Sequence, residues 1–156
     1  GAGDDAVPLV HYAADAGFRV TTLDHRPGLL TPARFPRATR LVLARPDDDS
    51  IELPAADHAL GVVMTHSFAH DRDWTRRLLA AGLPYVGLLG PRARTAEIRR
   101  AIGAERDGRL FGPVGLDLGA DGPRQVAISI VAELLAVVAG RIPRHLNERT
   151  EALHVG

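Results

Sequence analysis

The chain opens with Gly1-Ala2-Gly3-Asp4-Asp5-Ala6, a Gly-x-Gly-x-x-Ala pattern typical of the tight strand-to-helix turn that binds phosphate in dinucleotide-binding folds. In such a turn the first glycine permits a sharp bend, the second lets a phosphate approach the main chain, and Ala6 keeps helix and strand close. Asp24 closes the next hydrophobic run at the spacing expected of an acid that binds ribose hydroxyls, which fits better than the alternative of a cap or a salt bridge to Arg26. These two features predict an α/β fold with a nucleotide-like ligand.

This turn requires a buried strand that leads into Gly1, and the sequence given begins at Gly1 itself. We therefore expect that the first strand is missing from this sequence and that the sequence is a fragment of a longer chain.

Short apolar or β-branched runs predict four further strands, at residues 18–24, 41–44, 59–65 and 84–89. Apolar residues at helical spacing predict four helices, from the opening turn to Gly17, at 73–81, from Pro91 through Ile102 and at 125–138. Residues 114–119 are predicted to be a short strand or loop, and the helix at 125–138 is so apolar that we expect it to be largely buried. We place a single domain at 1–140 and a tail at 141–156.

Strands that alternate with helices favour a doubly wound, mainly parallel, three-layer α/β/α sheet of the Rossmann type. Ligands of such sheets bind beyond the carboxyl ends of the strands. Those ends carry Gly1 and Gly3, Asp24, His66 and the segment 87–92, which we expect to meet in one crevice.

Composition excludes several functions. All 19 basic residues are arginine, so no Schiff-base lysine exists, and the chain has no cysteine for a thiol nucleophile, a disulfide or a thiolate metal site. The 19 acidic residues bring the net charge to zero, which gives no reason to expect a nucleic acid or an anionic membrane as partner. No apolar run has the length of a membrane span, and we expect a cytoplasmic protein.

The individual site residues each have a functional and a purely structural interpretation. His66 follows a buried strand, where it either contacts a ligand or shuttles a proton, or is satisfied by nearby backbone. Gly90 precedes a helix start at which Arg92 and Arg94 either bind phosphate or pterin oxygens or lie solvated. Asp117 either contacts a polar ligand or caps a turn. Metal binding by His66 with its neighbours His70 and Asp71 is not expected.

Six segments together resemble the C-terminal domain of the XdhC/CoxI family, the maturation factors of xanthine dehydrogenase and related molybdenum hydroxylases. They are GAGDDAVPLV, VTTLDHRPG, VVMTHS, YVGLLGPRART, PVGLDLGA and AISIVAEL, in family order from Gly1 to about Ala139. Two departures are the absence of the family's cysteine-bearing N-terminal domain from this sequence and Pro91 in place of a small polar residue.

The resemblance implies a non-catalytic accessory domain, a chaperone that binds the molybdenum cofactor and assists its sulfuration and insertion into the apo-hydroxylase, with a cysteine desulfurase as second partner. On this interpretation the backbone of the opening turn, Asp4 included, holds the cofactor's phosphate, although the carboxylates of Asp4 and Asp5 repel it. Asp24 binds a hydroxyl, Arg92 and Arg94 meet residual charge, and His66 and Asp117 line the remaining wall.

Two alternatives stay open. An NAD-dependent oxidoreductase would place the dinucleotide in the same crevice with His66 as acid-base, and Asp24 would favour NAD over NADP. A dimerisation or scaffold module would leave the crevice empty. A homodimer is compatible with the first interpretation and with the third.

Overall fold

The computed structural model describes residues 1–53, 59–148 and 150. Its strands are β1 (Thr21–Asp24), β2 (Arg40–Leu43), β3 (Leu60–Val63), β4 (Tyr85–Leu88) and β5 (Leu110–Phe111). Its α-helices are α1 (Ala6–Asp15), α2 (Phe68–Ala80), α3 (Arg92–Ile102) and α4 (Pro123–Val138), and two 3-10 turns are η1 (Pro27–Leu29) and η3 (Leu146–Glu148). None of the helices in the described part of the chain combines the length and apolar character that crossing a bilayer requires.

All strand pairs are parallel, and they form two groups, β1-β2 and β3-β4-β5. The register pairs Thr21 with Arg40, Leu60 with Tyr85 and Val86 with Leu110. The start of the chain lies between the two groups, because Ala2 hydrogen-bonds Asp24 at the end of β1 and a Cβ on Gly1 would collide with Met64, just after β3. This is the position in which the sequence predicts a strand leading into Gly1.

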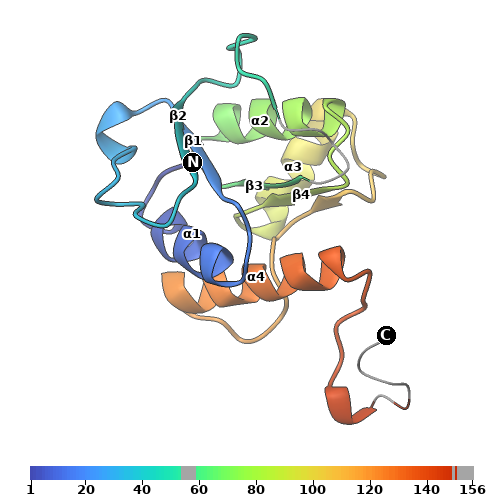
Figure 1. The fold of residues 1–156 in the computed structure, drawn as a ribbon. Helices are drawn as coiled ribbons and strands as arrows, with labels where there is room; N and C mark the ends of the chain where they lie inside the picture. The colour runs from blue at the N-terminus through green and yellow to red at the C-terminus, as the bar shows by residue number, and fades with distance from the viewer. Residues whose placement is uncertain (54–58, 149, 151–156) are drawn as a thin grey trace.

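Helices cover both faces of the strands, which makes a three-layer α/β/α Rossmann-like domain as predicted (Figure 1). Helices α1 and α4 pack against each other on one face, and α2 and α3 do so on the other. Each face has its own core, and β4 contributes to both. Tyr85 belongs to the core under α1 and α4, whereas Val86 and Leu88 belong to the core under α2 and α3. A strand buried on both faces explains the continuous apolar run in the sequence.

The structure corrects the sequence predictions at three places. Helix α2 begins at Phe68, not at 73, after the extended residue Ser67. The two-residue strand β5 was not predicted, whereas residues 114–119 form a loop, one of the two states predicted for them. Helix α4 is only half buried, since Ile128, Leu135 and Val138 expose 46–65% of their surface. In Figure 1 the chain beyond α4 stands off from the body of the domain, and the end of the predicted tail, at 149 and 151–156, lies outside the described residues.

Candidate functional site

The opening turn presents backbone N–H groups at the N-terminus of α1. The Ala6 and Val7 amides bond to the carbonyl oxygens of Gly3 and Asp4, at 3.1 and 3.2 Å. The three amides before them, at positions 3 to 5, have no hydrogen-bond acceptor among the described residues. Unpaired amides at the positive end of a helix dipole are suited to an anion.

Gly1 and Gly3 have different roles in this turn. A Cβ at Gly1 would collide with the carbonyl group of Met64 and lie 3.1 Å from the Cα of Thr65, so the close approach to β3 requires glycine. A Cβ at Gly3 would meet only the imidazole of His66, at 3.7 and 3.8 Å, which is ordinary contact. Gly3 therefore has no packing requirement for glycine, and its missing side chain leaves space between the turn and His66.

Asp24 is a buried anchor of the turn. Its residue is 3% exposed, and its carboxylate accepts hydrogen bonds from the Ala2 N–H at 2.7 Å and from the Arg26 N–H and guanidinium at 2.9 Å each. Burial alone would raise the pKa of Asp24, but the hydrogen bonds from Arg26 and Ala2 outweigh burial and hold the pKa well below its usual range. To accept a ligand hydroxyl, as the sequence predicts, Asp24 would have to release one of these donors.

A second acid of the turn, Asp4, is neutralised from a distant loop. The Arg34 guanidinium donates to Asp4 Oδ1 at 2.8 Å and to the Ala2 carbonyl oxygen at 3.4 Å. The Nε–H of Arg34 is buried and has no acceptor within the described part of the chain. A buried donor without an acceptor is uncommon in folded proteins. Arg34 was not predicted from the sequence, because its approach to the turn depends on the fold of the loop after β1.

His66 adopts a left-handed backbone conformation, with φ of 62°, three residues after the end of β3. Its side chain is exposed, and its Nε2 lies 3.1 Å from Asp5 Oδ2. Left-handed backbone is strained in a non-glycine residue, and such strain concentrates at functional sites. His66 thus faces the turn, next to Gly3, as predicted from its place after a buried strand.

Asp71 joins the end of β3 to the start of α3. Its side chain is 1% exposed and accepts hydrogen bonds from the Thr65 N–H at 2.9 Å, the Thr65 hydroxyl at 2.6 Å and the Arg94 guanidinium at 2.5 Å. The Arg94 guanidinium also lies 5.8 Å from the centre of the Phe68 ring. A Cβ on Gly90, whose φ is 140°, would lie 3.1 Å from Arg94 Cδ. Gly90 and Arg94 thereby reach the same edge of the sheet as His66.

Two of the predicted site residues make no polar side-chain contact with the residues around the opening turn. Arg92 is exposed at the first turn of α3, and Asp117 is exposed in the loop after β5. Neither has an ion pair or side-chain hydrogen bond to the described residues. Their proposed ligand contacts stay predictions.

One contact at this edge was not foreseen from the sequence. The rings of His25 and His70 meet edge to face, with centroids 4.5 Å apart, and His25 Nδ1 lies 3.4 Å from Asp24 Oδ1. Burial lowers the pKa of His25. The pair links the loop after β1 to the first turn of α2.

The family of the chain follows from comparison with known proteins. A family model described as the XdhC Rossmann domain matches residues 1–134. The chain belongs to the XdhC family. The matched segment contains the opening turn, Asp24, His66, the Asp71–Arg94 pair and most of α4, which confirms the resemblance found in the sequence.

Individual relatives of this XdhC domain are longer proteins. It is 41% identical over 135 residues to a probable xanthine dehydrogenase subunit from Bacillus subtilis (strain 168), and 29% identical over 143 residues to the uncharacterized protein YqeB of Escherichia coli (strain K12). The match to the Bacillus subtilis protein spans 86% of this chain and 40% of that protein. The match to YqeB spans 88% of this chain and 26% of that protein. A crystal structure described as that of a xanthine dehydrogenase from Bacillus halodurans superposes with a TM-score of 0.81 at 35% identity, over 91% of the chain and 42% of that structure.

Proposed function

We propose that this XdhC domain is a non-catalytic accessory module that binds the molybdenum cofactor and presents it for sulfuration and insertion into a xanthine dehydrogenase-type hydroxylase. The observation that carries the proposal is the group of three amides at positions 3 to 5, which find no acceptor among the described residues and lie beside His66 and the Asp4–Arg34 pair. The name of the Bacillus subtilis relative supports a hydroxylase as partner.

The residues present fit the phosphate of such a cofactor. The amides can donate hydrogen bonds to the phosphate, and the charge of the nearby Asp4 carboxylate, which would repel it, is already paired with Arg34. The missing Cβ of Gly3 gives a phosphate access to the main chain. When bound, the cofactor supplies the molybdenum centre for its client, and this domain holds and orients it.

Arg94 and Asp24 have supporting roles in this proposal. Arg94, whose charge is paired with that of Asp71, fixes the start of α3 at the same end of the strands as the turn, and Asp24 positions the turn through the Ala2 amide. A cysteine desulfurase would be the source of sulfur, because the chain itself contains no cysteine. No observation at the site favours the NAD-dependent alternative, since the four donors on Asp24 occupy the oxygens that a ribose diol would need.

Equilibrium titration of the chain with isolated molybdenum cofactor and, separately, with NAD tests the proposal. We expect saturable binding of the cofactor, and transfer of the bound cofactor to a cofactor-free molybdenum hydroxylase that regains activity. Binding of NAD with hydride transfer to a substrate would contradict it.

A matched pair of glycine variants locates the site. Gly3→Ala adds a Cβ in ordinary contact with His66, so it should fold while weakening cofactor binding at least about tenfold, or about 1.4 kcal/mol. Gly28→Ala, whose Cβ would have nothing within 4 Å, should bind as the parent does. Equal affinity of both variants would place the cofactor elsewhere.

A further inference from the structure

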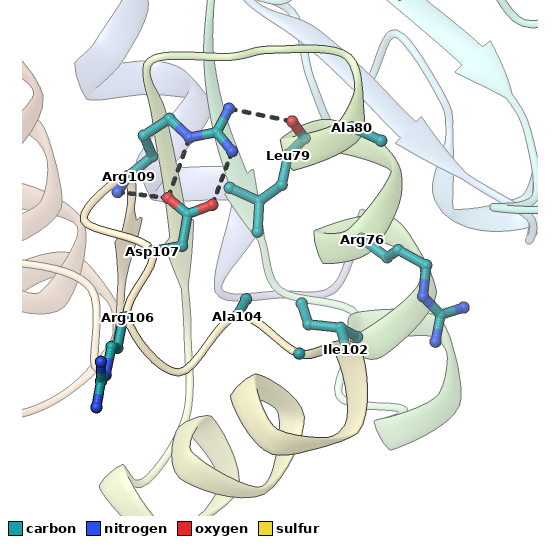
Figure 2. Close-up of a pocket in the computed structure, with 9 residues that line it drawn as sticks. Arg76, Leu79, Ala80, Ile102, Ala104, Arg106, Asp107 and Arg109 are labelled. Carbon is teal, nitrogen blue, oxygen red and sulfur yellow. Dashed lines mark hydrogen bonds and ion pairs between the residues drawn. The ribbon is translucent and has the colours of Figure 1, made fainter.

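A hollow of about 350 Å³ lies at the end of the strands opposite to the proposed cofactor site, where β4 and β5 begin (Figure 2). It is formed by the ends of α2 and α3 and by the loop that leads into β5. Its floor is apolar, with Leu79, Ile102 and Ala104, and three arginines surround it, Arg76, Arg106 and Arg109.

The three arginines are not equivalent. Arg109 is fixed, because its guanidinium binds Asp107 at 2.7 and 3.0 Å and donates to the Leu79 carbonyl oxygen at 3.1 Å. That last bond caps the carbonyl end of α2 and offsets its negative dipole. Arg109 therefore shapes the hollow and makes its wall compatible with an anion.

Arg76 and Arg106 carry the charge that is available to a partner. Figure 2 shows them on two sides of the apolar floor, extending outward from α2 and from the loop. The Arg76 side chain is 53% exposed and shares Asp73 with Arg72, at 3.2 Å from Arg76. Arg106 is exposed and has no ion pair among the described residues. An exposed guanidinium group can bind a carboxylate through two parallel hydrogen bonds, a bidentate pair.

The distribution of charge along the chain favours an acidic partner at this place. The segment 68–111, which contains α2, α3 and the hollow, has nine arginines and five acidic residues. The remainder of the chain has ten arginines and 14 acidic residues. The net charge of zero thus conceals a basic segment. Two of its arginines, Arg92 and Arg94, lie at the other end of the strands, but Arg76, Arg106 and Arg109 lie around the hollow, where they favour acidic surfaces.

We propose that this hollow docks an acidic peptide segment of a protein partner, with an apolar side chain against Leu79 and Ile102 and carboxylates on Arg76 and Arg106. A peptide fits better than a nucleic acid, because the floor is apolar, Asp107 lies in the wall and none of the described residues that line the hollow is an aromatic on which a base could stack. The proposal is independent of cofactor binding, since the hollow and the opening turn lie at opposite ends of the strands.

The test uses a blocked Glu-Glu-Leu-Glu-Glu peptide as probe, followed by amide chemical shifts of the full chain. We expect saturable shifts at Gly103, Ala104 and Gly108 that weaken as the salt concentration rises. The Arg76→Glu, Arg106→Glu double variant should bind the peptide at least about tenfold more weakly, from about threefold for each reversed contact. The control Arg124→Glu, an exposed arginine on α4, should bind as the parent does.

Two further probes complete the test. The blocked Gln-Gln-Leu-Gln-Gln peptide should bind at least about tenfold more weakly than the acidic peptide, because it lacks the carboxylates. A single-stranded oligonucleotide that shifts the same residues at lower concentration than the peptide would overturn the proposal. It would also be overturned by peptide shifts confined to other residues, by no shifts at all, or by equal affinities of the double variant and the Arg124→Glu control.

Discussion

The carboxylate of Asp24 accepts a hydrogen bond from the backbone N–H of Ala2 at 2.7 Å, which ties the opening turn to the end of β1. The residue that the sequence marks as a ribose acceptor therefore holds the phosphate-type turn in place. With Arg26 on both of its oxygens, Asp24 joins the first residues of the chain to the loop after β1.

Asp24→Asn should destabilise the domain. The substitution places an NH2 donor where an oxygen now accepts bonds, and it leaves buried donors unsatisfied, so we expect a loss of about 2 kcal/mol in the free energy of unfolding. Urea unfolding measures it. Asp15→Asn is the matched control, because Asp15 pairs with Arg37 at an exposed position, and should cost less than about 1 kcal/mol. Equal losses in the two variants would show that Asp24 is no anchor.

The same carboxylate gives the stability a dependence on acid pH. Since the folded-state pKa of Asp24 lies below its unfolded value near 4, its contribution is complete above about pH 4 and is lost as the pH falls further. Urea unfolding between neutral and acid pH should show a shallower decline for Asp24→Asn than for the parent. Parallel pH profiles would contradict this assignment.

Tyr85 should make the domain sensitive to alkali. Its hydroxyl donates to Glu133, which also accepts the Gly115 N–H at 3.2 Å, and burial together with the Glu133 hydrogen bond raises the pKa of Tyr85. The folded state retains a proton that the unfolded state releases near pH 10, so stability is complete below about pH 10 and decreases above it. Tyr85→Phe should remove this alkaline decrease. Retention of the full decrease in the variant would assign it to another group.

Gly1→Ala tests the close approach of the turn to β3. The added Cβ would collide with the Met64 carbonyl group, which is backbone and cannot rotate away, so we expect a loss of about 1–3 kcal/mol. Gly28→Ala, with open space around it, should leave the free energy of unfolding unchanged or raise it slightly. Thermal and urea unfolding of the pair provide the comparison, and a fully stable Gly1→Ala would refute the packing described.

His66→Gly should stabilise the domain, because glycine adopts a φ of 62° without the strain that a Cβ introduces. A gain of up to about 1 kcal/mol is expected, since the exposed contact with Asp5 contributes little. His70→Gly, inside α2, should instead lower stability by about 1 kcal/mol. If His66→Gly weakens cofactor binding while it raises stability, His66 acts on the ligand and not on the fold.

Much of the fold could be predicted because its signals are local. The glycine turn, the β-branched run that ends at Asp24 and the apolar run before His66 each identify an element within a few residues. Strand β5 has two residues and leaves too short a pattern to detect. The start of α2 was missed because Ala69 to Asp73 is mostly polar and lacks a hydrophobic period.

The candidate site was harder to predict from the sequence, because the roles of its residues depend on distant partners. Asp24 has a partner, Arg26, only two residues away, and this spacing was a usable sign of an internal ion pair. The burial of Asp71 by Thr65 and Arg94 and the contact of His25 with His70 arise only when separate elements pack. The exposed apolar side of α4 likewise reflects its position on the surface of the domain rather than its composition.

The most direct measurement of the central claim is a titration of the chain with molybdenum cofactor before and after enzymatic removal of the cofactor's phosphate. If the amides at positions 3 to 5 hold that phosphate, the intact cofactor binds saturably and the dephosphorylated form binds at least about tenfold more weakly. Equal binding of the two forms, or binding of neither, would contradict the account.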